Sequence, residues 1–243
     1  MIRYLINFIF PPRCAGCDAR FPIESREHVC VTCRASVERL SAPLCHTCGV
    51  PIELSLEAEQ NRTFRECSAT PPHFTMARAI ARYRSIEEAY APLPSIIRRH
   101  QYGRDQALTH ALAEFLDDPI PLADNDYDLI MPVPLHPERL RWRGFNQAAL
   151  LAATVARRLR RPLDVRSLAR SRATAPQTAK DRRDRHRNVC DAFTVHRSAQ
   201  LANRRVLLVD DVMTTGSTAD ECARTLLAAG ARRVDVLALA RVI

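Results

Sequence analysis

The sequence predicts an α/β protein, in which helices flank a parallel β-sheet, with a small cysteine-rich unit at the amino terminus. Two observations support this fold class. The apolar runs at Val206–Val209 and Val234–Ala240 enclose a helical pattern at Thr218–Ala229, with Gly230 placed to end the helix. This is the order of a βαβ unit. Near the amino terminus, six cysteines form three Cys-x-x-Cys pairs, a spacing typical of metal-binding turns.

The first two cysteine pairs predict a structural zinc site with the ligands Cys14, Cys17, Cys30 and Cys33. Each short turn presents two thiolates to one ion, and two turns complete a tetrahedral site. Since four thiolates leave no open position, this zinc would stabilise the fold and take no part in catalysis. A disulfide framework is the alternative. However, the apolar start of the chain ends at Pro11-Pro12 and lacks the cleavage pattern of a secretory signal.

The third cysteine pair has no complete partner, because Phe64 occupies the position that would make a fourth pair. A candidate second zinc site therefore consists of Cys45, Cys48 and Cys67. Either His46 or His73 completes this site, or the second ribbon has lost its metal.

The chain of 243 residues divides into two predicted units. Residues 1–70 form the cysteine-rich domain and a linker, and residues 71–243 form the larger domain. An apolar fraction of 47% is enough to fill the core of the larger domain. No apolar run is long enough to cross a membrane, so we expect a soluble protein without a membrane span.

The larger domain is predicted to alternate strands and helices before the βαβ unit. In chain order, we expect an edge strand at Met76–Arg84, amphipathic helices at Glu87–Arg99 and Gln106–Leu116, a strand at Tyr127–Met131, a helix at Asn146–Leu159 and a strand at Pro162–Val165. This alternation is expected for a mostly parallel sheet.

Two adjacent acids, Asp210 and Asp211, follow the apolar run, and a hydroxyl-rich turn leads from Met213 into the predicted helix. Ligands bind at this edge of a parallel sheet. Consecutive backbone N–H groups, the hydroxyls and the positive end of the helix suit a monoester phosphate. The acids would repel a phosphate, so we expect them to face sugar hydroxyls and a hydrated Mg²⁺. Helix capping alone would not need two acids and four hydroxyl residues in nine positions.

Two other interpretations of the paired acids fail. A P-loop ATPase needs a glycine-rich loop that ends in Gly-Lys-Ser or Gly-Lys-Thr. This chain has six glycines and Lys180 as its single lysine, and no such loop. A response-regulator receiver needs a phosphate acceptor on a later strand, whereas only one βαβ unit remains after Asp211.

A second loop has the composition of an anion site. The strand at Tyr127–Met131 leads into Pro132, Val133, Pro134, Leu135 and His136. Prolines after a strand form a loop and stop the sheet from continuing. The arginine-rich stretch that follows includes Arg143, whose guanidinium suits bidentate anion binding. An exposed basic turn is the alternative.

A basic segment at 157–187 carries twelve Arg or Lys residues and three acids. We expect a long loop over the site from about Ser167 to Asn188, which would close over a bound ligand or contact nucleic acid. The net charge of +9 also favours phosphate backbones. The aromatic content of 6% makes no base-stacking platform evident. The residues expected in these roles are Arg172, Lys180, Arg182 and Arg183.

The segment Val206–Thr218 resembles the ribose-phosphate signature of type I phosphoribosyltransferases. The resemblance implies that Asp210 and Asp211 contact the ribose of phosphoribosyl pyrophosphate, and that Mg²⁺ bridges ribose and pyrophosphate. It assigns the pyrophosphate to the loop 132–136 and Arg143. The 5-phosphate is assigned to Met213, Thr214, Thr215, Gly216, Ser217 and Thr218.

The chain as a whole is similar to ComF proteins, because its motifs occur in the same order from the Phe-Pro-Pro-Arg-Cys start to Thr218. The resemblance implies a zinc ribbon joined to a phosphoribosyltransferase-like domain. It also implies a cytoplasmic role in the uptake and use of external DNA, with the DNA-translocation machinery as a partner. Many relatives have a lysine where this chain has Gln101. A nucleobase-salvage phosphoribosyltransferase and a non-catalytic adaptor that binds single-stranded DNA are the alternatives.

Overall fold

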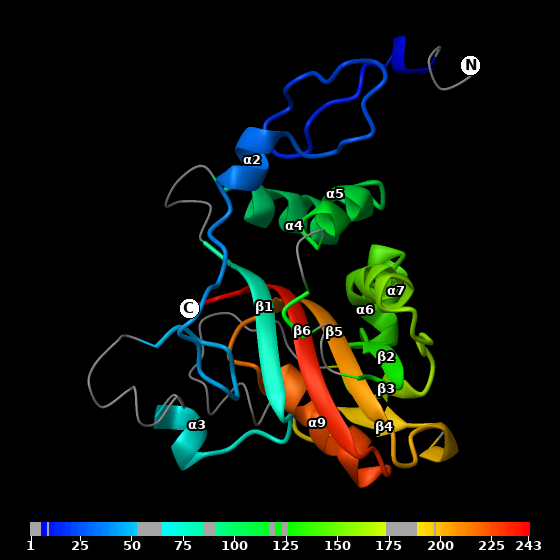
Figure 1. The fold of residues 1–243 in the computed structure, drawn as a ribbon. Coiled ribbons are helices and arrows are strands. Elements are labelled where there is room, and N and C mark those ends of the chain that lie inside the picture. Colours follow the sequence, from blue (N-terminus) through cyan, green and yellow to red (C-terminus); the bar gives the residue numbers. More distant parts are fainter. Residues whose placement is uncertain are drawn as a thin grey trace.

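The computed structural model describes residues 6–8, 10–52, 65–84, 91–116, 120–122, 126–173, 189–196 and 198–243. Its centre is a four-stranded parallel sheet with the strand order β1-β6-β5-β2 (Figure 1). The strands are β1 (Met76–Arg82), β2 (Leu129–Pro132), β5 (Arg205–Met213) and β6 (Arg233–Arg241). The predicted parallel α/β sheet is therefore confirmed, and β1 is the edge strand that the sequence predicted.

Strand β5 continues past the apolar run that predicted it. It pairs with β6 from Arg205 opposite Arg233 to Met213 opposite Arg241. The predicted end at Val209 is therefore four residues short. The long apolar strand β6 offers hydrogen-bonding partners beside the acids, so the β5 backbone stays extended through Asp210 and beyond.

Three helices cover one face of the sheet: α4 (Pro92–Tyr102), α5 (Leu108–Glu114) and α7 (Gln147–Leu159). Their apolar side chains form one buried cluster with Ile130, Leu207 and Leu237 from the strands. The Asn146 side chain accepts a hydrogen bond from the N–H of Ala148 and so begins α7. Burial of this apolar stripe is the main stabilisation of each helix.

The opposite face is covered by α9 (Ser217–Ala228) and a small antiparallel pair, β3 (Leu168–Arg170) with β4 (Phe193–Val195). The 3₁₀ turn Ser198–Gln200 follows β4. Strand residues Leu208 and Val236, which alternate with those facing α4, belong to this second cluster. Gly230 has a φ of +101°, as expected for a glycine that ends a helix.

The structure corrects three expectations. Helix α4 begins at Pro92, later than the predicted start at Glu87, and it extends past the predicted end at Arg99 to Tyr102, because Gly103 provides its cap. The predicted strand Pro162–Val165 is reduced to one bridge between Leu163 and Ile130, since the Asp164 carboxylate accepts the N–H groups of a turn. The predicted loop from Ser167 begins later, because 168–170 form β3. Residues 174–188 lie outside the described residues.

The amino-terminal part contains the short helices α2 (Val31–Ala35) and α3 (Arg65–Ala69). It also covers the free edge of the sheet, since the N–H of Leu40 donates to Ile80 O and the N–H of Ala77 donates to Thr47 O. Figure 1 shows the first cysteine loops beyond α4 and α5, on the side away from the sheet. In the part of the chain that the structure describes, no helix is long and apolar enough to cross a membrane.

Candidate ligand site and cysteine clusters

The candidate ligand site lies at the carboxyl end of β5, where Asp210 and Asp211 are both half-buried. The Asp210 carboxylate accepts the N–H of Asp211 at 2.9 Å, and the Asp211 carboxylate accepts the N–H of Val212 at 2.8 Å. Burial raises the pKa of Asp210 well above its ordinary value, and the Asp211 charge raises it further. A bound cation would favour the ionised form of this pair.

The turn after β5 has the geometry of an anion-binding loop. Gly216 has a φ of +84° and is the N-cap residue of α9, which spans twelve residues. Gly216 offers no side-chain cap, and the first helical N–H, that of Ser217, donates to Thr215 Oγ1 at 3.4 Å. The hydroxyls of Thr215 and Ser217 share a hydrogen bond at 2.9 Å. Thr214 is exposed and Thr218 half-buried. The turn therefore presents hydroxyls and a helix amino terminus beside the two acids.

Met213 was predicted to contribute its backbone N–H, and its side chain points away from solvent. Its side chain is buried, and its sulfur lies 3.2 Å from Nη1 of Arg241. Its carbonyl accepts the N–H of Val242. The Met213 side chain therefore packs in the core below the loop.

The second predicted loop lies beside the first at the same edge. The N–H of Val133 donates to Val209 O at 2.9 Å, which joins β2 to β5 just before the acids. Pro132 and Val133 are buried, whereas Pro134, Leu135 and His136 are half-buried. Parallel pairing of β2 with β5 thus brings together two loops that lie far apart in the sequence.

Helix α6 (Pro137–Arg143) follows this loop and has no buried residues. Its N-cap residue is His136, whose Nδ1 accepts the N–H of Glu138 at 3.4 Å. Nη1 of Arg143 donates to Gln147 Oε1 at 3.1 Å, and its guanidinium lies 5.4 Å from the ring centroid of Tyr102. Arg143 is thus held between α4 and α7.

Two residues beside the acids were not among the predicted site residues. Gln101, at the end of α4, donates from Nε2 to the Asp211 carboxylate. Arg170 in β3 is buried, and its charge lies close enough to lower the pKa of Asp210. No short sequence pattern connects either residue to Asp210–Asp211, because both reach the site through tertiary packing.

The predicted lid residues are placed only in part. Arg172 is exposed and donates from Nη2 to Cys190 O, at the base of the basic segment. The other three, Lys180, Arg182 and Arg183, lie outside the described residues. Their roles stay predictions.

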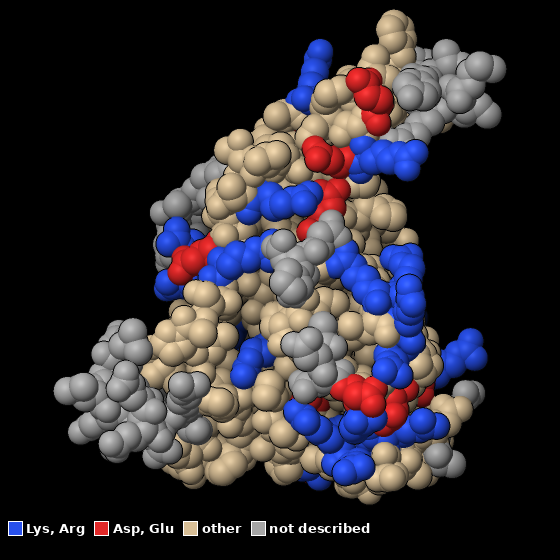
Figure 2. Space-filling model, in the orientation of Figure 1, with Lys and Arg blue, Asp and Glu red and all other residues tan. Residues whose placement is uncertain are grey.

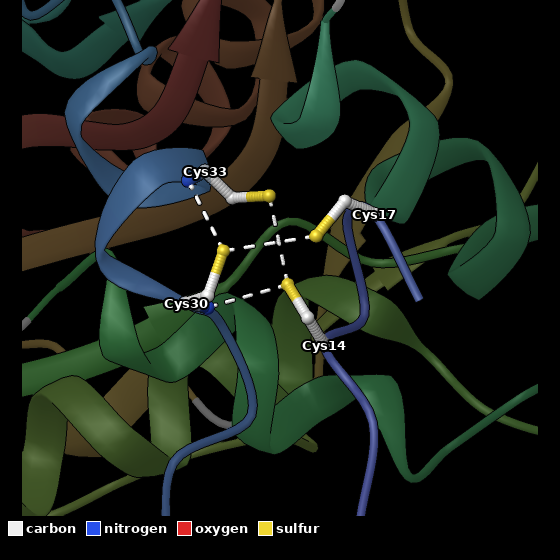
Figure 3. Close-up of side chains that lie close together, drawn as sticks. All are labelled: Cys14, Cys17, Cys30 and Cys33. Atoms are coloured by element: carbon white, nitrogen blue, oxygen red, sulfur yellow. Dashed lines mark hydrogen bonds between the residues drawn. The ribbon is translucent and has the colours of Figure 1, made fainter. Parts of the chain in front are cut away.

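The first four cysteines converge as the spacing predicted. Figure 3 shows the sulfurs of Cys14, Cys17, Cys30 and Cys33 pointing toward one another. The Cys14 and Cys33 sulfurs are 3.5 Å apart, and those of Cys17 and Cys30 are 3.7 Å apart. Sulfurs about 2.3 Å from a tetrahedral zinc ion would be separated by about 3.8 Å. The cluster therefore fits a closed structural zinc site.

Backbone donors prepare this cluster for metal. The N–H groups of Gly16 and Cys30 donate to the Cys14 sulfur at 3.4 and 3.2 Å. Burial raises the pKa of the Cys14 thiol, but these N–H groups, with the N–H of Cys17 and the Cys33 side chain, outweigh burial and lower the pKa to about 7. Because zinc binds the thiolate, a lowered pKa reduces the free energy needed for metal binding at neutral pH.

The second cluster contains Cys45, Cys48 and Cys67, all buried. Among the described residues, neither predicted histidine joins it: His46 is exposed, and Nδ1 of His73 pairs with the Asp220 carboxylate at 3.1 Å. Burial raises the pKa of the Cys67 thiol, and the two neighbouring cysteines raise it further. A bound metal ion would stabilise the thiolate forms of these three cysteines, which otherwise repel one another.

Two arginines join the second cluster to the sheet. Nη1 of Arg78 in β1 donates to Cys45 O at 3.2 Å and to His46 O at 3.1 Å. Nη1 of Arg241 in β6 donates to Cys48 O at 2.6 Å. The cysteine turn is thereby attached to β1 and β6, and the same Arg241 Nη1 lies 3.2 Å from the Met213 sulfur below the ligand loop.

Comparisons with known proteins match both parts of the chain. The family model of a double zinc ribbon domain matches residues 5–69, and that of a phosphoribosyl transferase domain matches residues 146–242. Together with the parallel sheet and the cysteine clusters, these matches define the class. It is a phosphoribosyltransferase fold with an amino-terminal double zinc ribbon, whose cysteines support structural zinc.

The chain is 33% identical to DNA utilization protein YhgH of Salmonella typhimurium, over 88% of this chain and 90% of that protein. It is 31% identical to competence protein F of Haemophilus influenzae, over 98% and 100%. The chain therefore belongs to the ComF family. An adenine phosphoribosyltransferase from Thermoanaerobacter pseudethanolicus is 17% identical, covers 70% of this chain and 92% of its own, and has a TM-score of 0.38.

Proposed function

We propose that this protein binds phosphoribosyl pyrophosphate with Mg²⁺ and acts in the uptake and use of external DNA. One observation carries the ligand assignment. The paired carboxylates of Asp210 and Asp211 lie directly beside a turn that leads into the amino terminus of α9, whose N-cap residue is Gly216. Acids for sugar hydroxyls and N–H groups for a phosphate are thus combined at one edge of a parallel sheet.

The assignment of each part of the ligand follows from charge. Asp210 and Asp211 would accept hydrogen bonds from the ribose 2′- and 3′-hydroxyls and face the hydrated Mg²⁺. The turn 213–218 would hold the 5-phosphate through backbone N–H groups and hydroxyls. The loop 132–136 and Arg143, at the neighbouring strand end, would hold the pyrophosphate.

A transfer reaction at this site would break the bond between ribose C1 and a pyrophosphate oxygen. Positive charge then develops at C1, and the bond electrons leave with the pyrophosphate. A lone pair of the acceptor forms the new bond to C1, and the acceptor loses a proton. When bound, Mg²⁺ supplies charge neutralisation on the leaving group. The protein residues position the sugar through Asp210 and Asp211, while Arg143 stabilises the departing anion. The cysteine clusters take no part in this reaction and would stabilise the fold by binding zinc.

The role in DNA use is supported by the family. The printed names of two relatives are DNA utilization protein and competence protein F. We extend that role to this chain, with a cytoplasmic location and the proteins of DNA translocation as partners. With this role, nucleobases and DNA are the candidate acceptors of the phosphoribosyl group.

The decisive experiment is calorimetry of the purified protein with phosphoribosyl pyrophosphate and Mg²⁺. We expect the Asp210→Asn, Asp211→Asn double variant to lose binding, because both groups that face the sugar become neutral. The control is Asp126→Asn, an exposed acid that pairs with Arg205 at the other end of β5. Equal affinity in the double variant and the wild type would remove the proposal. A screen of nucleobase and DNA acceptors for released pyrophosphate then tests catalysis.

A further inference from the structure

Two exposed aromatic side chains meet beside the candidate ligand site. Tyr102, at the end of α4, is 60% exposed, and Trp142 of α6 is 51% exposed. Their ring centroids are 6.5 Å apart, with an interplanar angle of 66°. Exposed faces of this size leave apolar area in water that a planar partner would cover.

Each ring has an arginine against it. The guanidinium of Arg104 lies 5.2 Å from the Trp142 ring centroid, and that of Arg143 lies 5.4 Å from the Tyr102 centroid. Helix α6 adds Arg139 and Arg141. Figure 2 shows Lys and Arg side chains gathered on the side of the molecule where α6 and α7 lie in Figure 1. The surface therefore combines stacking faces with positive charge.

The acids Asp105 and Glu138 lie in segments that together carry more arginines than acids, so the surface stays positive. The arginines are Arg104, Arg139, Arg141 and Arg143. Asp105 follows Arg104, and its Oδ1 accepts the N–H of Ala107. Glu138 is exposed at the opposite end of α6, where its carboxylate lies 3.7 Å from Nδ1 of His136. An acidic, planar ligand is thus favoured over a basic one.

Tyr102 of this pair also lines a pocket of about 400 Å³, together with Tyr83, Arg98 and Gln101. Gln101 donates to the Asp211 carboxylate. A chain that stacks on Trp142 and Tyr102 would therefore lie next to the edge of the ligand site.

We propose that Tyr102, Arg104, Trp142 and Arg143 form a binding surface for single-stranded DNA, with bases stacked on the two rings and phosphates paired with the arginines. The choice of DNA rests on the proposed function. Single strands are favoured because their bases expose flat faces, whereas a duplex keeps them stacked inside. These four residues differ from those expected in the lid, which are Arg172, Lys180, Arg182 and Arg183.

Trp142 is the single tryptophan of the chain, so tryptophan fluorescence measures binding at this surface. We expect its fluorescence to be quenched by an oligothymidine of about 16 nucleotides, a length within the usual site size of such surfaces. An oligomer of equal length without bases carries the same phosphates and should quench far less. Equal quenching by both oligomers would show that only phosphates bind, which overturns the proposal.

The variants Trp142→Ala and Arg104→Ala test the surface with a labelled oligomer. We expect Trp142→Ala to weaken binding roughly tenfold or more, as for a lost stacking partner, and Trp142→Phe to restore part of it. Neither substitution should unfold the protein, because Trp142 and Arg104 are both exposed. The matched controls are Leu140→Ala, an exposed residue of the same helix, and Arg232→Ala, an exposed arginine before β6.

The outcomes for the two proposals are distinguishable. Wild-type affinity for DNA in Trp142→Ala and Arg104→Ala, or no DNA binding by the wild type at low salt, overturns the stacking surface. Calorimetry of the same variants with phosphoribosyl pyrophosphate should give wild-type affinity. If the wild type does not bind phosphoribosyl pyrophosphate, the proposed function is overturned. The DNA-binding measurements are still valid in that case.

Discussion

At the scale of single residues, the ionisation of Asp210 links the ligand site to stability. The carboxyl group is half-buried beside Asp211, and burial followed by the Asp211 charge raises its pKa in the folded protein. Arg170 opposes this increase through its positive charge. The protein thus keeps a carboxyl group where ionisation is unfavourable, which is common in sites that bind a cation or a sugar.

The raised pKa predicts a specific pH dependence. The unfolded chain ionises Asp210 near pH 3.9, so the folded state holds a proton that the unfolded state has released between about pH 4 and the raised pKa. Stability from this group is therefore full below about pH 4 and is lost as the pH rises through the raised pKa. Asp210→Asn cannot ionise, so its stability relative to the wild type should increase with pH.

Denaturant unfolding of both proteins at several pH values measures this difference. Asp126→Asn, at the opposite end of β5, is the control for a lost surface carboxylate. A difference between Asp210→Asn and the wild type that is constant across the range, or that shrinks as the pH rises, would contradict the prediction.

At the scale of elements, the turn between β5 and α9 depends on a glycine. Gly216 has a φ of +84°, and a Cβ atom there would lie 2.6 Å from Cε of Met213. We expect Gly216→Ala to destabilise the protein by about 1–3 kcal/mol and to weaken phosphoribosyl pyrophosphate binding, because alanine is strained at this φ and the buried Met213 side chain must move.

Gly230→Ala provides the matched comparison for Gly216→Ala. Gly230 also has a positive φ, +101°, but a Cβ atom there would come no closer than 3.8 Å to Ala202. It lies at the far end of α9. We therefore expect a similar loss of stability in denaturant unfolding without a change in ligand affinity by calorimetry. A Gly216→Ala protein with wild-type affinity would show that the turn does not hold the phosphate.

The basic segment makes a second prediction at this scale. If it contacts DNA, single-strand binding should weaken with salt by a log–log slope of roughly −0.7 per phosphate contact. Neutralising four residues together should flatten the slope by up to roughly 3. The residues are Arg172, Lys180, Arg182 and Arg183. If they act only as a lid, the same change weakens phosphoribosyl pyrophosphate binding and leaves DNA affinity unchanged.

A control for the lost charge removes four exposed arginines elsewhere. These are Arg20, Arg26, Arg204 and Arg232. Binding measured by anisotropy across a salt series compares the two variants. Identical slopes and ligand affinities in both would contradict either role for the basic segment.

At the scale of the whole molecule, the first cysteine cluster is packed into the main core. Cys14, Val29 and Cys33 belong to the same buried cluster as the helices α4 and α5. Glu114 of α5 accepts the N–H groups of His28 and Val29 at 2.6 and 3.1 Å. We propose residues 1–70 and 71–243 as two domains, and these contacts join them closely.

Metal removal should therefore affect more than the ribbon. The wild type is expected to contain about one tightly bound zinc, and Cys30→Ser should lose it because the site falls to three thiolates. We expect the ribbon to unfold while the sheet stays folded, and α4 and α5 to lose protection where they contact the ribbon. Metal analysis and hydrogen exchange measure both effects. Cys190→Ser, an exposed cysteine outside the clusters, is the control.

The sequence by itself determined the local features of this protein. The β5 strand, the acids, the glycine turn and the first cysteine pairs are each set by neighbouring residues. Hydrophobic periodicity, turn chemistry and ligand spacing all operate within a few positions along the chain. These features could be predicted because the backbone conformation they need is local. The strand ends were less predictable, as the extension of β5 to Met213 depends on its partner β6.

Only the tertiary structure decided which distant residues share the site. Gln101 reaches Asp211 across 110 positions, and Tyr102 meets Trp142 across the α4–α6 contact. The low aromatic content concealed this stacking surface, because composition says nothing about where two rings are placed. Such contacts arise when helices pack on a sheet and fix the direction of their side chains, and no local pattern in the chain carries that information.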